Sequence, residues 1–108
     1  MSSPPVGASF FHAGILVDKD GVTEGAQGME FADHPVIQTY NFNLQQPIDQ
    51  SECVVVCTPR AASSTSNLTA QVTMPSTTKV TVTCCINGAP GGFDFWLAIF
   101  RINVGPSV

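Results

Sequence analysis

The chain has 108 residues, enough for one domain, and its 4 basic and 8 acidic residues give a net charge of −4. Four basic side chains are too few to form the positively charged surface that binds nucleic acid or an anionic membrane, so neither is an expected partner. The longest apolar run, residues 95–100, is far too short to span a bilayer, and the N-terminus lacks the basic and apolar regions of a signal peptide.

Apolar and polar residues alternate with a period of two along most of the chain, which is typical of β-strands. Gly or Pro interrupts every stretch that shows a helical repeat. We therefore predict an N-terminal arm over residues 1–7 and one domain over residues 8–108. The predicted strands, in chain order, are residues 8–17, 22–31, 36–44, 52–58, 68–74, 79–86 and 93–104.

About seven strands at this spacing predict an all-β fold, a single antiparallel β-sandwich or jelly roll. In residues 36–44, Tyr40, Phe42 and Leu44 share one face of the strand. Residues 52–58 are apolar on both faces, as in a central buried strand. Residues 22–31 form a weaker strand, with glycines that indicate a bulge or an irregular edge.

The last predicted strand is apolar on both faces after Asp94, whereas a two-layer sandwich covers only one face of each sheet. Charged residues are only 11% of the chain and hydrophobic residues 44%, so the charged coat is sparse. We expect other subunits to cover Trp96 and Phe100, the alternative being a strand wrapped by its own loops. With Phe10 and Phe11, these side chains are the predicted subunit interface.

The four cysteines do not have the spacing of a metal site. Cys53 and Cys57 lie on one face of a strand but about 13 Å apart, because each residue advances the strand by about 3.3 Å. Cys84 and Cys85 point to opposite faces. We expect free thiols and no metal, and a contact between Cys84 and one of the first pair stays open.

No constellation for catalysis is present in the sequence. The two histidines, His12 and His34, have no nucleophile motif beside them. The carboxylates of Asp18, Asp20 and Glu24 surround a turn without the spacing of a calcium loop. The chain is therefore expected not to be an enzyme and to need no cofactor.

Four segments, in order, carry a resemblance to a known family. They are Tyr40-Asn41-Phe42-Asn43-Leu44, Cys53-Val54-Val55-Val56-Cys57-Thr58-Pro59, Lys79-Val80-Thr81-Val82-Thr83-Cys84 and Phe93-Asp94-Phe95-Trp96-Leu97-Ala98-Ile99-Phe100-Arg101. Over residues 8–103 the chain resembles the small β-sandwich domain at the tips of bacteriophage tail fibres and of related virion surface proteins. The resemblance implies a homotrimer in which the terminal strands contribute to subunit contacts.

A tail fibre needs a trimeric stem, and no heptads, collagen repeats or β-helix precede the predicted domain. The expected function is therefore that of a capsid decoration (cement) protein, made in the host bacterial cytoplasm and bound to the major capsid protein on the virion surface. The arm, with Pro4, Pro5 and Val6, is expected to contact the capsid. The alternative is a fibre tip that binds a host receptor or glycan through loops near residues 33–34, 63–67 and 87–92.

Overall fold

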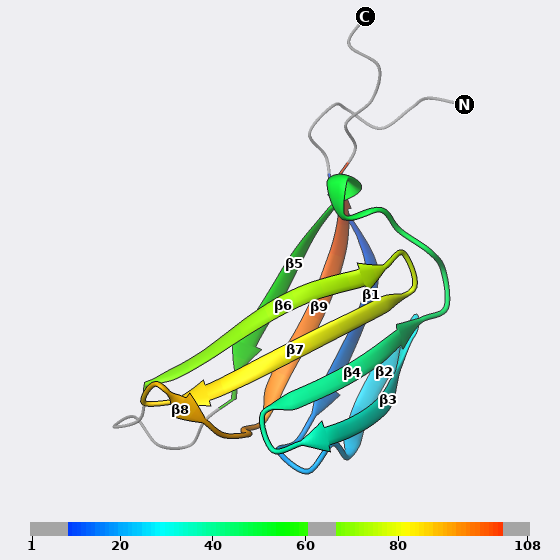
Figure 1. Cartoon of the computed structure of the whole chain (residues 1–108). Coiled ribbons are helices and arrows are strands. Elements are labelled where there is room, and N and C mark those ends of the chain that lie inside the picture. The colour runs from blue at the N-terminus through cyan, green and yellow to red at the C-terminus, as the bar shows by residue number, and fades with distance from the viewer. Residues whose placement is uncertain (1–8, 61–66, 103–108) are drawn as a thin grey trace, which may run out of the picture.

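The computed structural model describes residues 9–60 and 67–102 of the chain (Figure 1). Nine strands and one short 3-10 helix lie in these residues, so the all-β class is confirmed while the strand count exceeds the seven predicted. The elements are β1 (Ser9–Val17), β2 (Thr23–Gln27), β3 (Met29–Val36), β4 (Thr39–Leu44), η1 (Gln50–Glu52), β5 (Cys53–Pro59), β6 (Leu68–Ser76), β7 (Lys79–Ile86), β8 (Ala89–Pro90) and β9 (Phe95–Ile102). No helix in the described ranges has both the length and the apolar character needed to cross a membrane.

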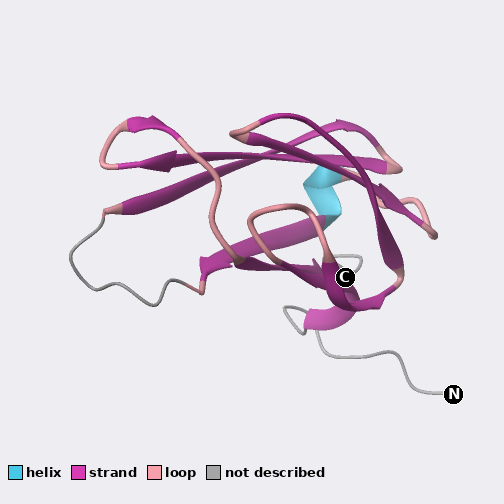
Figure 2. Ribbon diagram, turned by 90° about the horizontal axis from the view of Figure 1, so that it is seen from below, coloured by secondary structure: helices cyan, strands magenta, loops and turns pink. Residues whose placement is uncertain are grey.

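The strands form two antiparallel sheets packed face to face, with the layers visible in Figure 2. The four-stranded sheet has the order β2-β1-β9-β5. The five-stranded sheet has the order β3-β4-β7-β6, and β8 adds a short pairing to β7. The predicted sandwich is thus what the structure shows, and β9, the last of the described strands, lies between β1 and β5 in the four-stranded sheet.

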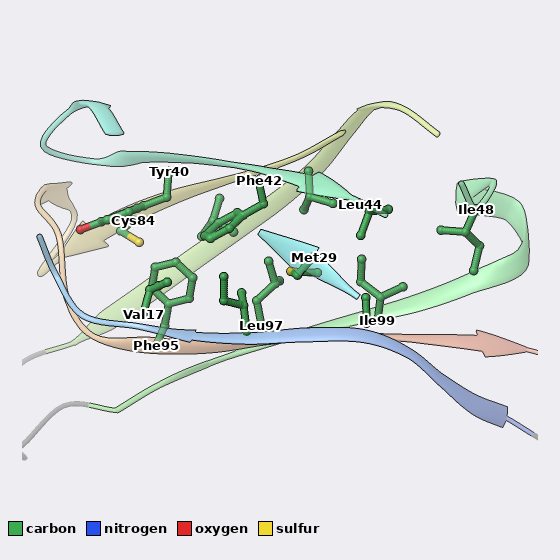
Figure 3. Close-up of a cluster of buried hydrophobic side chains, with 14 of the residues drawn as sticks. Val17, Met29, Tyr40, Phe42, Leu44, Ile48, Cys84, Phe95, Leu97 and Ile99 are labelled. Atoms are coloured by element: carbon green, nitrogen blue, oxygen red, sulfur yellow. The ribbon is translucent and has the colours of Figure 1, made fainter. Parts of the chain in front are cut away.

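The core lies between the sheets and follows the predicted alternation (Figure 3). Tyr40, Phe42 and Leu44 are buried, whereas Asn41 and Asn43 between them are only partly covered. In β9 the ring of Phe95 meets those of Tyr40 and Phe42 edge-on, with centroids 5.1 and 6.0 Å apart. Edge-to-face contacts of this kind add to the free energy of burial. The buried apolar side chains are Ala13, Ile15, Val17, Met29, Tyr40, Phe42, Leu44, Ile48, Val80, Val82, Cys84, Phe93, Phe95, Leu97 and Ile99.

The predicted strand over residues 22–31 is two strands that belong to different sheets. β2 pairs with β1, β3 pairs with β4, and Gly28 separates them with a φ of +76°. A Cβ on Gly28 would lie 2.9 Å from the carbonyl oxygen of His12, so the chain crosses between the layers against the backbone of β1. A positive φ and this close approach both require glycine.

The prediction that residues 52–58 form a central buried strand is wrong. β5 pairs only with β9 and is an edge of the four-stranded sheet. None of its residues is fully buried, and Val54 and Val56 are 45% and 43% exposed. The apolar residues on its second face therefore lie on the surface of the molecule.

Several predicted boundaries also shift. β3 extends to Val36 and a turn precedes β4, so the predicted strand over 36–44 begins at Thr39 instead. The predicted last strand, 93–104, is β9 over Phe95–Ile102, and residues 103–104 lie outside the described ranges. The predicted arm, residues 1–7, also lies outside them.

Candidate interaction surface

The outer face of the four-stranded sheet, which we call the apolar face, is built by strand register around β9. Residues paired across antiparallel strands point to the same side of the sheet, so each outward residue of β9 has outward neighbours on β1 and β5. The three rows are Phe11–Phe100–Val54, Gly14–Ala98–Val56 and Leu16–Trp96–Thr58. β2 extends the last two rows with Gln27 beside Gly14 and Gly25 beside Leu16.

None of the side chains in these rows is charged, and most are apolar and open to solvent. Trp96 is 51% exposed, Phe11 47% and Leu16 37%, and the two outward valines of β5 are exposed to a similar degree. The opposite faces of the same strands carry the buried core residues. β1 and β9 are therefore apolar on both sides, one side being covered by the second sheet and the other uncovered.

A hollow of about 360 Å³ lies on this face over β2, β1 and β9. Gly14, Gly25 and Ala98 form its floor because they have little or no side chain, while Phe11, Leu16 and Trp96 stand beside them. The ring of Phe11 leans toward Gly14, since a Cβ on Gly14 would lie 2.9 Å from its Cζ. The same ring meets Phe100 edge-on at 5.9 Å, which holds this wall of the hollow in place.

The structure brings together three of the four predicted interface residues. Phe11, Trp96 and Phe100 lie on the apolar face. Phe10 pairs with Arg101 instead, and so it points to the opposite side of the sheet, where it is 46% exposed. The predicted capsid contacts, Pro4, Pro5 and Val6, lie outside the described residues.

Sequence reasoning missed Leu16, Val54, Val56 and the glycines of the hollow. The signal for the valines was present, because residues 53–57 are apolar on both faces. That pattern also fits a strand buried from both sides, and only the pairing of β5 with a single neighbour shows that one face is open.

The outer face of the five-stranded sheet, which we call the polar face, has the opposite character. The Asn41 side-chain amide donates to Asp33 Oδ1 at 2.6 Å, and the Thr81 hydroxyl donates to Asn41 Oδ1 at 2.8 Å. Beside them, Lys79 Nζ donates to Asn43 Oδ1 at 3.3 Å. These side chains line a groove of about 300 Å³, so hydrogen-bonding groups cover the face where the other sheet presents hydrocarbon.

The histidines bond to backbone carbonyls. The ring of His34 stacks on Tyr40 with centroids 4.1 Å apart, and its Nδ1 lies 2.8 Å from the carbonyl oxygen of Thr39. His12 Nε2 lies 2.9 Å from the carbonyl oxygen of Gln46. In the described ranges no hydrogen bond joins either ring to a carboxylate or a nucleophile, so neither has the arrangement of a catalytic base.

The four cysteines are free thiols. Burial, with a smaller contribution from a neighbouring thiol, raises the pKa values of Cys57 and Cys84 to about 12. Cys53 Sγ lies 3.8 Å from Met74 Sδ, a contact between the two sheets. Within residues 9–60 and 67–102 no group of three or more His, Cys, Asp or Glu side chains converges as metal ligands would.

No protein-family model matches this chain, and neither a curated protein nor a solved structure matches it significantly.

Proposed function

We propose that the chain is a non-enzymatic structural protein of a bacteriophage particle, a capsid decoration protein that forms homotrimers and stabilises the head. The observation that carries this proposal is the apolar face, where Phe11, Leu16, Trp96, Val54 and Val56 stand open to solvent in rows that contain no charged residue. A soluble protein keeps such a surface when another protein covers it.

The energetics favour covering this face with sister copies. Each Å² of apolar surface removed from water contributes about 25 cal/mol, and aromatic side chains such as Phe11, Trp96 and Phe100 dominate the energetics of interfaces. An uncharged face is best matched by an uncharged partner, because a charged group buried against it would lose its water without gaining a counter-charge. A second copy of the same face satisfies this condition.

The virion role rests on the resemblance of four strand segments to phage surface domains, and the apolar face supports it by providing the subunit contact. A decoration protein acts by burying surface across joints of a shell and needs no turnover. The polar face, with Asp33, Asn41 and Thr81, would then be left toward solvent.

Two measurements test the proposal. Light scattering of the purified chain is expected to give the mass of three copies, and Trp96→Ala to give that of one. A gel of purified virions is expected to show hundreds of copies per particle. A wild-type chain that stays a single copy at every concentration refutes the trimer, and absence from the particle refutes the virion role.

A fibre tip is the second candidate, and the polar face favours it. Its carboxylate, amide, hydroxyl and ammonium groups are held in place by hydrogen bonds, which suits recognition of a hydroxyl-rich receptor. This candidate predicts a few copies per virion rather than hundreds. The loop residues 63–66, expected to help in recognition, lie outside the described ranges.

A further inference from the structure

The two halves of the apolar face differ in shape. The β1–β2 half is hollowed, because Gly14 and Gly25 leave a space of about 360 Å³ between taller side chains. The β5 edge carries Val54 and Val56, whose branched side chains are 45% and 43% exposed. We call these two valines the β5 ridge and the glycine-floored space the β1–β2 hollow. One face thus contains both a projection and a depression of the same apolar chemistry.

We propose that the β5 ridge of one copy packs into the β1–β2 hollow of the next copy, an inference that rests on the proposed self-association. Val54 and Val56 offer methyl groups of the size that the space over Gly14 and Gly25 accepts. No charge has to be buried on either side, because none of the side chains in the rows of the apolar face is charged.

Around a three-fold axis this contact is heterologous, since each copy uses one patch to bind its neighbour on one side and the other patch for the neighbour on the other side. In the proposed homotrimer the contacts close into a ring of three copies. Ring closure strengthens the assembly, because the last contact forms between copies that are already held together.

Paired cysteines test this packing. Residues on β2 and β5 are separated by three interstrand spacings of about 4.8 Å, or about 14 Å, well beyond the roughly 7 Å that a disulfide spans between Cα atoms. In the double variant Gly25→Cys/Val56→Cys, a bond between the new thiols therefore joins two copies. With copper phenanthroline as the oxidant, we expect a covalent trimer on a denaturing, non-reducing gel.

The two single variants are the matched controls, and neither is expected to cross-link. Both positions tolerate cysteine, because a Cβ on Gly25 meets no atom within 4 Å and Val56 is an exposed edge residue. Circular dichroism of each variant checks the fold. Cys57, the residue after Val56 in β5, has a pKa raised to about 12 by burial, so its thiol competes poorly in oxidation at pH 8.

The outcomes separate this inference from the proposed function. A trimer by light scattering that gives no cross-link in the double variant overturns the ridge-and-hollow contact and leaves the trimer standing. A covalent dimer alone overturns the packing of each ridge into the next copy of a ring of three, because a two-fold pair joins ridge to hollow twice and stops at two copies. A chain that stays a single copy in solution refutes both proposals.

Discussion

The guanidinium of Arg60 holds both carboxylate oxygens of Glu24, at 2.7 Å from Nη2 and 3.3 Å from Nη1. Arg60 follows β5 and Glu24 lies in β2, so the ion pair links the two edges of the four-stranded sheet. Nη2 also donates to the carbonyl oxygen of Val17 at 3.2 Å, and the Arg60 amide donates to the carbonyl oxygen of Asp94 at 2.8 Å. One residue thus ties all four strands together at one end of the sheet.

Replacing Arg60 with alanine is expected to lower the melting temperature, because the link between the sheet edges is lost. Arg101→Ala is the matched control, since Arg101 bonds Glu52 at 2.9 Å but is more exposed. Thermal denaturation followed by circular dichroism should show the larger loss for Arg60→Ala, and 1 M salt should narrow its gap from wild type. Equal melting temperatures for the two variants would contradict the structural role of Arg60.

Truncating Phe95, whose ring lies at the centre of the core, should strongly destabilise the fold. Phe95 is fully buried and its ring meets those of Tyr40, Phe42 and Phe93. Phe95→Ala is expected to lower the free energy of unfolding by about 3–5 kcal/mol, because it leaves a cavity at this junction. Urea denaturation measures the loss. The control is Phe10→Ala, at a half-exposed ring, and a comparable loss there would argue against the core placed around Phe95.

Gly92 lies in the loop between β8 and β9, and Gly92→Ala tests how closely this loop packs against Tyr40. A Cβ at this position would collide with Tyr40 Oη, which donates a hydrogen bond to the Lys19 carbonyl oxygen at 2.5 Å, and would lie 2.8 Å from the Ile37 carbonyl oxygen. Overpacking of this kind costs about 1–3 kcal/mol of unfolding free energy. If the collision with Oη contributes, Gly92→Ala should lower the unfolding free energy less in a Tyr40→Phe background than in the wild type. Urea denaturation of the two single variants and the double variant measures this difference. Losses of unfolding free energy that simply add would refute a role for the collision with Oη.

Alkaline pH should destabilise the fold through two thiols, the buried Cys84 and the partly buried Cys57. Burial raises the pKa values of Cys57 and Cys84 from the ordinary 9.0 to about 12, so between pH 9 and 12 the unfolded chain releases protons that the folded chain keeps. Raising the pH through this window therefore favours unfolding, whereas below pH 9 the effect is absent. The free energy of unfolding should fall from pH 8 to pH 10.

The double variant Cys57→Ala/Cys84→Ala should flatten this fall below pH 10. Above pH 10 a decline remains in the variant, because burial also raises the pKa of Tyr40 above its ordinary value of 10.0. Cys84→Ala also lowers the unfolding free energy by an amount that does not depend on pH, because it truncates a core side chain. Comparing the slopes of unfolding free energy against pH, rather than the values, removes this constant loss. If the unfolding free energy of the variant falls between pH 8 and 10 as steeply as that of the wild type, groups other than these two thiols cause the fall.

Trp96 is the sole tryptophan of the chain, so its fluorescence reports on the apolar face. In one isolated copy it is 51% exposed. Dilution that dissociates an oligomer should therefore shift the emission to longer wavelength and increase quenching by iodide. An emission maximum that stays constant while light scattering shows dissociation would place Trp96 away from the subunit contact.

Local alternation was enough to predict the inward faces of the main strands. Tyr40, Phe42 and Leu44 share one face of their strand, as predicted, and that face points into the core, as do Val80 and Val82 of β7. Period-two patterning fixes these faces because a shift of one residue would expose every apolar side chain of a strand.

Pairing partners were not predictable in the same way. Residues 53–57 are apolar on both faces whether β5 lies in the centre or at an edge, and the choice depends on β9, far along the chain. Likewise, Phe10 and Phe11 were grouped as neighbours in sequence, yet consecutive strand residues point to opposite sides. The hollow depends on Gly14 and Gly25 meeting across two strands, which no local pattern reveals.

The central position of β9 also has a consequence for biosynthesis. Both β1 and β5 pair with β9, and Ser9 lies opposite Ile102, so this sheet joins the first and last described parts of the chain. While the polypeptide is emerging from the ribosome, β1 and β5 have no β9 between them, and the long loops that must close make the pairing slow. The nascent chain therefore presents unpaired apolar strands until β9 has left the ribosome, and exposed strand edges of this kind are prone to aggregation.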